Sequence, residues 1–545
     1  MFSTAHLRSI SALTAIAFAV LLAACSKPAD TAPPVAAAPA SVAITKLIDR
    51  ADTGIAWKHA SSDADVDAAF AQARAETKPV FVYWGAKWCP PCNQVKATLF
   101  NRQDFIERSR AFVPVYVDGD SPGAQKLGAR FKVGGYPTMV LFNAQGTEMT
   151  RLPGEVEAER YTQVLTLGMN AQKPVKEVLA QVKAGGAGLT ANDWRLLAFY
   201  SFDTDQQQLV PRGGMPALLK QLADACPADQ AEVATRLRLK ALAAVDDKAP
   251  ARPDAAAQAM LLKVLADAPA ARAYMDVLTN SATDITRALA APGTPQRAAL
   301  LTAFNVALKR FEADTTLSRA DRMTALIAQV DLAAIDAPKD AKPALSEALL
   351  ADIRAQTAKA DREITDGYER QSVITSAAYL LQKAGLGAES DTLLKANLAK
   401  SHSPYYLMSS LAGNAKARGD KTEALDWYEQ AFDKSEGPAT RLQWGASYVN
   451  ALVELGPTEE ARIEKAASQL FAEAARLPDA FYERSGRSLQ RVGTRLQAWN
   501  KGGAHTAAIK RLQTQLDGVC GALDVAGPNR ANCAALLKTA PKQTA

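Results

Sequence analysis

Residues 80–92 read VFVYWGAKWCPPC, and residues 134–138 read GGYPT. The first stretch begins with a β-branched and aromatic run, which is typical of a buried strand. Two prolines follow its first cysteine, at positions where the first turn of a helix tolerates residues without an amide hydrogen. The stretch therefore predicts a strand followed by a helix that begins at Cys89.

The segments that follow repeat this alternation of strand and helix. Residues 143–146 read NAQG, which predicts a hairpin turn between the last two strands. Strands and helices that alternate in this way favour an α/β core with parallel strands. The expected strands are residues 112–118, 138–142 and 147–152, and the expected helices are residues 124–131 and 155–169.

These segments together resemble the thioredoxin superfamily, and within it the reductase domain at the C-terminal end of DsbD-type periplasmic proteins. The resemblance covers residues 55–172 and implies a thioredoxin fold with a redox-active Cys-x-x-Cys pair. Thioredoxins usually have a buried acid and a lysine where this chain has Tyr83 and Pro114. Their proton-relay pair is therefore absent from these two positions.

The chemistry expected of the cysteine pair is thiol–disulfide exchange. A helix N-terminus stabilises a thiolate and lowers the thiol pKa below its free value of about 8.5. Cys89 is therefore the predicted nucleophile. Cys92 is the predicted resolving thiol, which attacks the mixed disulfide and releases the partner as a dithiol.

Six further residues are predicted to support the pair. The resemblance implies that Pro137 is cis and that the backbone of Tyr136 offers hydrogen bonds to a bound peptide. Trp88 and Tyr136 are expected to flank the sulfurs and to form an apolar contact surface for a partner. The supporting residues are Trp88, Pro90, Pro91, Tyr136, Pro137 and Thr138.

A zinc site is the main alternative use of a Cys-x-x-Cys segment. A structural zinc site needs two more Cys or His ligands, and the histidines outside the expected export signal are His59, His402 and His505. These are scattered along the chain, so we expect neither a metal nor another cofactor. Lys and Arg exceed Asp and Glu by only six, without a basic run, so nucleic acid is not an expected partner.

The N-terminus predicts export and a lipid anchor. Residues 1–24 have the apolar stretch of a signal peptide, and the end of that stretch, Leu-Ala-Ala-Cys25, resembles a bacterial lipobox. This resemblance implies cleavage before Cys25 and its lipidation, with an ordinary signal peptide as the alternative. Residues 25–45 form an Ala/Pro-rich tether. We expect a periplasm-facing lipoprotein, and Ser26 favours the outer membrane because it is not a retention signal.

The long remainder of the chain predicts helices. The expected domains after the tether are a thioredoxin-like domain at 46–172, a helical region at 173–370, and a degenerate tetratricopeptide-like helical region at 371–545. The spacing around Gly419 resembles one tetratricopeptide unit, and an irregular helical bundle is the alternative for the whole region. Stacked helix pairs leave a free face that suits partner binding.

The remaining three cysteines suggest one structural bond. Cys520 and Cys533 are close enough in sequence to close a loop between two helices, which would contribute about 3 kcal/mol in the chain-entropy model. Cys226 then remains as an odd thiol, which is typical of a buried small hydrophobic residue.

The predicted function is that of an envelope thiol–disulfide oxidoreductase, a reductase or isomerase of protein disulfides that binds partners through its helical region. Its expected partners are disulfide-containing envelope proteins and a membrane electron donor of DsbD type. One alternative is a helical-repeat scaffold or envelope assembly factor whose thioredoxin-like domain binds peptides. Another alternative is a thiol reductant for c-type cytochrome maturation.

Overall fold

A computed structural model describes residues 54–538 apart from positions 155, 212, 247–248, 339–340 and 526. The expected signal peptide at 1–24, the lipidation site Cys25 and the tether at 25–45 lie outside these described residues. The described residues belong to one compact unit of the chain.

A five-stranded mixed sheet forms the first part of this unit. The strand order is β1-β3-β2-β4-β5, with β2 parallel to β3 and antiparallel to β4. The strands are β1 (Lys58–His59), β2 (Val80–Gly85), β3 (Val113–Asp118), β4 (Thr138–Phe142) and β5 (Glu148–Leu152). The strands predicted around 80–84, 112–118, 138–142 and 147–152 are thus confirmed within one residue at each end.

Helices cover both faces of the sheet because side chains alternate along the buried strand β2. Phe81 and Tyr83 pack against one group of helices, α2, α3 and α5. Val82 and Trp84 point to the other face, where α1 and α4 pack. These helices are α1 (Asp63–Glu76), α2 (Pro90–Thr98), α3 (Gln103–Arg108), α4 (Ala124–Phe131) and α5 (Ala158–Met169), with the 3₁₀ helix η2 (Ser109–Ala111) after α3. This arrangement is the predicted thioredoxin fold.

The described residues after β5 are helical or irregular, which confirms the predicted all-α region. Its first half contains α6 (Val175–Lys183), α7 (Ala191–Phe199), η3 (Phe202–Thr204), α8 (Met215–Ala225), α9 (Ala231–Ala243), α10 (Ala255–Ala266), α11 (Ala268–Ala273), α12 (Met275–Asn280), α13 (Ala282–Leu289), α14 (Pro295–Ala313), α15 (Arg319–Ala333) and α16 (Glu347–Glu363). Its second half contains α17 (Gly367–Lys383), α18 (Gly387–Asn397), η4 (Leu398–Lys400), α19 (Pro404–Ala417), α20 (Lys421–Lys434), α21 (Pro438–Leu455), α22 (Glu460–Ala475), α23 (Glu483–Trp499), α24 (Thr506–Gly521) and α25 (Pro528–Ala535).

The tetratricopeptide-like spacing falls on the helix pair α19 and α20. Gly419 lies between the two helices with φ +81°, a left-handed conformation that favours glycine. Ala412, Ala424 and Ala431 are buried, so small side chains lie where the two helices pack closely. The tetratricopeptide-like spacing around Gly419 thus corresponds to a helical hairpin, formed by α19 and α20.

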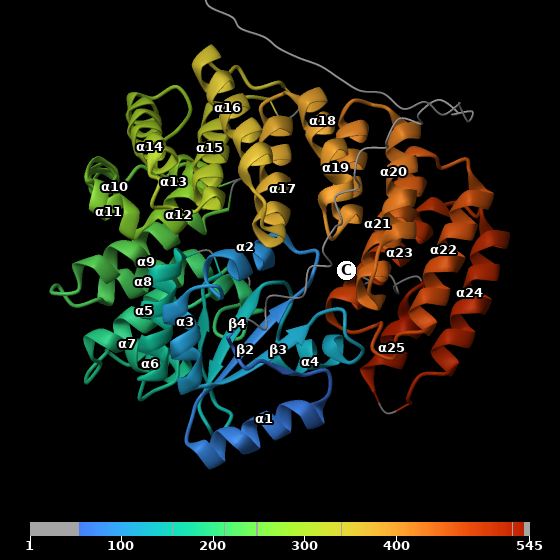
Figure 1. Cartoon of the computed structure of the whole chain (residues 1–545), viewed down its shortest axis with the longest axis horizontal. Helices are drawn as coiled ribbons and strands as arrows, with labels where there is room; N and C mark the ends of the chain where they lie inside the picture. The colour runs from blue at the N-terminus through green and yellow to red at the C-terminus, as the bar shows by residue number, and fades with distance from the viewer. Residues whose placement is uncertain are drawn as a thin grey trace, which may run out of the picture. The chain divides into compact units, whose positions relative to one another are not determined.

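The helical region packs against the α/β domain along several of its elements: α2 lies beside α17, as Figure 1 shows, and α4 contacts α23. Side chains bridge the two parts at points far apart in sequence. Gln94 of α2 donates a hydrogen bond to Asp321 of α15, and Arg272 of α11 forms an ion pair with Glu157. The cysteine pair lies at the start of α2, within this contact.

Candidate functional site

The cysteine pair lies at the N-terminus of α2, directly after β2 and its short connecting loop. Cys89 and Cys92 form a disulfide with their Cα atoms 5.2 Å apart. Cys89 is the N-cap residue, and the backbone amide of Cys92 donates to its Sγ over 3.2 Å. Pro90 and Pro91 occupy the first turn, where no intrahelical donor is needed. Because the Cys92 amide and the positive end of the helix dipole point toward this sulfur, the site stabilises a thiolate once the bond is reduced.

The segment GGYPT lies beside the first cysteine. The Tyr136–Pro137 peptide bond is cis, as the sequence resemblance implied. The Sγ of Cys89 is 3.6 Å from the carbonyl oxygen of Tyr136. Thr138 donates its hydroxyl to the carbonyl of Gly135, which closes the turn before β4.

The Tyr136 side chain packs against α4 and the segment that follows β3. Its hydroxyl accepts a hydrogen bond from Gln125 of α4 over 2.9 Å. Its ring lies directly against Gly119, where a Cβ would come within 2.3 Å of the ring. Burial raises the pKa of Tyr136 to about 12, so the phenol stays neutral at physiological pH.

The opposite side of the pair is covered by the helical region. Trp88 is only 6% exposed and packs 4.9 Å from the ring of Trp444 and 6.1 Å from the ring of Tyr406. Gln371 of α17 donates to the Trp88 carbonyl over 3.2 Å. The sequence suggested Trp88 as part of a contact surface for a partner; in the structure, the protein's own helices occupy that surface.

This cover leaves the cysteines almost inaccessible. Cys89 is 2% exposed and Cys92 is fully buried. Both belong to an apolar cluster that includes Tyr405 and Met408 of α19 and Trp444 of α21. A partner's sulfur therefore cannot reach Cys89 from the Trp88 side in this arrangement.

A cation from the helical region lies between the two aromatic residues that flank the pair. The guanidinium of Arg484, in α23, is 4.7 Å from the Trp88 ring and 5.3 Å from the Tyr136 ring. Its Nε donates to Gln443 of α21 over 2.6 Å. Burial lowers the pKa of Arg484. Sequence reasoning missed this residue because nothing in the local pattern around position 484 indicates that it faces position 88.

Two carboxylates fasten the cover to the α/β domain. Asp479, in the segment before α23, accepts hydrogen bonds from the backbone amides of Gln125 and Lys126, so it caps α4 from outside that helix. Asp120 follows β3 and accepts hydrogen bonds from the amide and hydroxyl of Thr440 over 2.7 and 2.6 Å. Burial raises the pKa of Asp120 to about 7.

A large cavity adjoins the other side of the pair. It measures about 880 Å³, which is within the range of ligand sites in proteins. Pro91, Tyr136 and Pro137 form part of one wall, and α9 and α12 contribute to the opposite wall.

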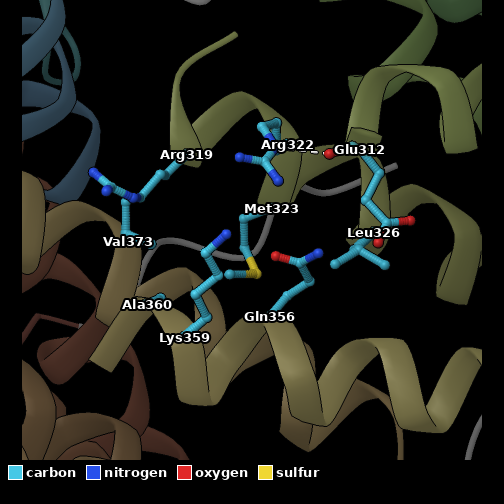
Figure 2. Close-up of a pocket in the computed structure, with 9 residues that line it drawn as sticks. All are labelled: Glu312, Arg319, Arg322, Met323, Leu326, Gln356, Lys359, Ala360 and Val373. Atoms are coloured by element: carbon cyan, nitrogen blue, oxygen red, sulfur yellow. Dashed lines mark hydrogen bonds between the residues drawn. The ribbon is translucent and has the colours of Figure 1, made fainter. Parts of the chain in front are cut away.

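A second pocket lies between α15, α16 and α17, and it is far smaller than the cavity beside Pro137. Figure 2 shows Arg319, Arg322 and Lys359 gathered around it, with the Nε of Arg322 donating to the Glu312 carbonyl. Its volume is about 20 Å³, room for about one water molecule. It is too small to be a substrate site.

The positions of the missing relay pair are filled by apolar packing. Tyr83 is buried in β2 and stacks on Tyr116 with ring centroids 5.3 Å apart. Pro114 lies opposite Phe81 in the parallel pairing of β2 with β3. No carboxylate–lysine pair is therefore present at these two positions.

The other cysteines lie apart from this site. Cys520 and Cys533 form a disulfide that joins α24 to α25. Cys226 is a partly buried free thiol whose pKa is raised, chiefly by burial.

Across the described part of the chain, no three Cys, His, Asp or Glu side chains gather as a metal site. None of the described helices is long and apolar enough to cross a membrane.

Comparisons with known proteins match the α/β domain. The family model described as a thioredoxin-like domain matches residues 66–168. The thiol:disulfide interchange protein DsbD of Klebsiella pneumoniae is 31% identical over 112 residues, which are 20% of this chain and 18% of that protein. The thiol:disulfide interchange protein DsbD 1 of Pseudomonas aeruginosa is 29% identical over 106 residues, 19% of this chain and 18% of that protein. The chain thus spans less than a fifth of the length of these relatives.

Proposed function

Because residues 66–168 form a thioredoxin-like domain with a Cys-x-x-Cys pair, we propose that this protein is a thiol–disulfide oxidoreductase that reduces or isomerises disulfides of partner proteins. The observation that carries the proposal is the position of the Cys89 sulfur. It lies at the first turn of α2 and 3.6 Å from the carbonyl that precedes cis-Pro137. This is the place where a thiolate is stabilised and a peptide backbone can align.

The exchange takes two steps. In the reduced protein, the Cys89 thiolate attacks one sulfur of the partner's disulfide, forms a mixed disulfide and releases the partner's other sulfur as a thiolate. Cys92 then loses its proton and attacks the Cys89 sulfur, which frees the partner as a dithiol. The partner gains two electrons, and the protein is left with the Cys89–Cys92 disulfide.

A further turnover needs a dithiol that returns two electrons to the pair. The relatives are named thiol:disulfide interchange proteins. We take from them the proposal that a DsbD-type membrane protein is the donor and that the protein works in the bacterial envelope. Lipidation of Cys25 would hold it there, on the periplasmic side of a membrane.

The burial of the pair favours a second candidate function. Cys89 and Cys92 are closed off by α19 and α21, an arrangement suited to a scaffold that holds its thioredoxin-like domain in place. In that case the helical region would bind partners and the cysteine pair would not turn over.

Trapping separates the two candidates. The full chain with Cys92→Ser is expressed in the envelope, and extracts are run on non-reducing gels. An oxidoreductase accumulates mixed disulfides that disappear on reduction and are absent from the Cys89→Ser Cys92→Ser control. A scaffold gives no such adducts, and the wild-type protein then also fails to reduce insulin. Cys226→Ala in every variant excludes adducts on the odd thiol.

The location is tested separately. Cys25→Ala is expected to release the protein from the membrane fraction and to abolish processing that is sensitive to globomycin. A Cys25→Ala protein that stays on the membrane contradicts the lipid anchor.

A further inference from the structure

The two sides of the redox pair differ in what faces them. On the Trp88 side, Trp444 and Tyr406 of the protein's own helices leave no free surface. On the Pro137 side, the cavity of about 880 Å³ reaches Pro91 and Tyr136. Cys89 itself does not line the cavity, but Tyr136 does, and the Tyr136 carbonyl oxygen is 3.6 Å from the Cys89 sulfur.

From this asymmetry we infer that the cavity is the client site, and that it holds an extended, cysteine-containing segment of a partner protein between the Pro137 loop and helices α9 and α12. The inference rests on the proposed function and extends it to this chain's own helical region. The helices do not merely recruit a client elsewhere; they form the second wall against which it reacts.

The walls of the cavity suit a polypeptide. On the α/β side, the loop of Gly134 and Gly135 presents backbone rather than side chains. The guanidinium of Arg487 donates to the Gly134 carbonyl over 2.6 Å and forms an ion pair with Glu483, so α23 holds this loop in place. A volume of this size exceeds the need of a small thiol and matches several side chains of an extended segment.

The opposite wall adds charge. Arg236 of α9 is buried and paired with Asp276 of α12, which leaves this pair nearly neutral. Lys240 of α9 donates to the backbone carbonyl of Tyr200 over 2.8 Å instead of binding a carboxylate. Asp203 lines the same cavity and offsets part of the charge of Lys240, so the lining has three basic residues, Arg236, Lys240 and Arg487, against two acidic ones, Asp203 and Asp276, and a net charge of +1. A cysteine flanked by acidic side chains is the client that this wall favours.

The test compares two disulfides with the same leaving group. One is neutral 4,4′-dithiodipyridine, and the other is a short acidic cysteine peptide activated as its thiopyridyl disulfide. The reduced full chain, with Cys25→Ala and Cys226→Ala, releases 4-thiopyridine from each, and absorbance reports the rate.

Two variants fill the cavity, and one control adds the same ring elsewhere. Asn280→Trp and Ala244→Trp place an indole on the wall formed by α12 and the end of α9. Ala256→Trp places it on the exposed face of α10, outside the cavity. We expect both cavity variants to slow the peptide reaction about tenfold or more. Their reaction with dithiodipyridine, and both reactions of Ala256→Trp, stay near wild type.

Equal peptide rates in Asn280→Trp, Ala244→Trp and wild type would overturn the cavity as the client site while leaving the exchange chemistry intact. The proposed function fails separately, if wild type releases 4-thiopyridine from neither disulfide. If wild type reacts with neither disulfide, a second measurement still tests the site. A benzophenone amino acid is placed at position 280 of the Cys89→Ser Cys92→Ser protein, and photo-cross-linking to the peptide is measured. Cross-linking to the same peptide with its cysteine reduced supports the site, and its absence contradicts the site as well.

Discussion

The two sides of the cysteine pair differ in how far a partner can approach Cys89 from each. Trp88, on one side, is sealed beneath aromatic residues of α19 and α21. Pro137, on the other side, faces a cavity with a polar wall. In a thioredoxin-like domain by itself, neither side would be covered by α19 or α21. Here α19 and α21 close one side, and α9 and α12 help to shape the other.

The cover on the Trp88 side should loosen when the indole ring of Trp444 is removed. Trp444 is buried against Trp88 and Tyr405, so Trp444→Ala should lower the free energy of unfolding by about 3–5 kcal/mol. It should also speed alkylation of the reduced Cys89 thiol by about tenfold or more, because the cover loosens. Denaturant unfolding and mass-resolved alkylation measure the two effects. The control is Trp499→Ala, which removes a partly buried indole outside the site. Equal alkylation rates in Trp444→Ala and Trp499→Ala would contradict the idea that Trp444 covers Cys89.

The stability of the folded protein should depend on pH through Asp120, which joins the cover to the α/β domain. Burial raises the pKa of this carboxyl from 3.8 to about 7, with Asp118 adding to the rise and Arg484 opposing it. Between these values the folded protein keeps a proton that the unfolded protein has released. Stability therefore falls as pH rises from about 4 to 7, by up to about 1.4 kcal/mol per pH unit.

Asp120→Asn should flatten this pH dependence, because an amide can still accept the hydrogen bonds of Thr440 without titrating. Denaturant midpoints across the pH range measure it. Asp517→Asn, at an exposed position on α24, should leave the slope unchanged. A slope that survives Asp120→Asn would remove this carboxyl from the account.

A smaller effect is expected at the outside cap of α4. Asp479→Ala removes the acceptor for the amides of Gln125 and Lys126 and should cost about 1 kcal/mol. Asp479→Asn keeps an acceptor oxygen and should recover most of that loss. Thermal or denaturant unfolding distinguishes the two variants, and an equal loss in both would mean that the negative charge, not the acceptor, matters.

The smallest effect concerns Arg484, a positioning residue between Trp88 and Tyr136. Removing its positive charge with Arg484→Met should raise the pKa of the Cys89 thiol by less than about one unit. Arg484→Lys should restore most of the original value. The pH profile of iodoacetamide alkylation reports this pKa, and Arg491→Met, at an exposed position on the same helix, is the control. A profile that shifts equally in Arg484→Met and Arg491→Met would show a general charge effect.

Sequence patterns were sufficient for the α/β domain because its signals are local. The apolar run before Cys89, the prolines after it and the NAQG turn each act within a few residues. Strands β2 to β5 begin and end within one residue of the predicted bounds, and α2 begins directly after Cys89. The all-helical remainder followed from composition and period in the same way. The cis bond before Pro137 followed from resemblance, since no local pattern distinguishes it from a trans turn.

The cover and the cavity could not be predicted in this way. Gln371 reaches the carbonyl of Trp88 across 283 residues of sequence, and Asp120 meets Thr440 across 320. Such contacts depend on how successive helix pairs stack, and small differences in packing angle accumulate along the chain. An arginine at position 484 looks like any polar residue near a helix start. Only the assembled fold shows that it faces the redox pair.

One measurement tests most directly whether a partner approaches from the Pro137 side. The Cys92→Ser protein is joined through Cys89 to a cysteine peptide that carries a photoreactive group beside its cysteine, and the cross-linked residues are located by mass spectrometry. The account predicts labels on the cavity wall of α9 and α12, around Lys240 and Asn280. Labels on Tyr406 and Trp444, with the cavity wall unmarked, would contradict it.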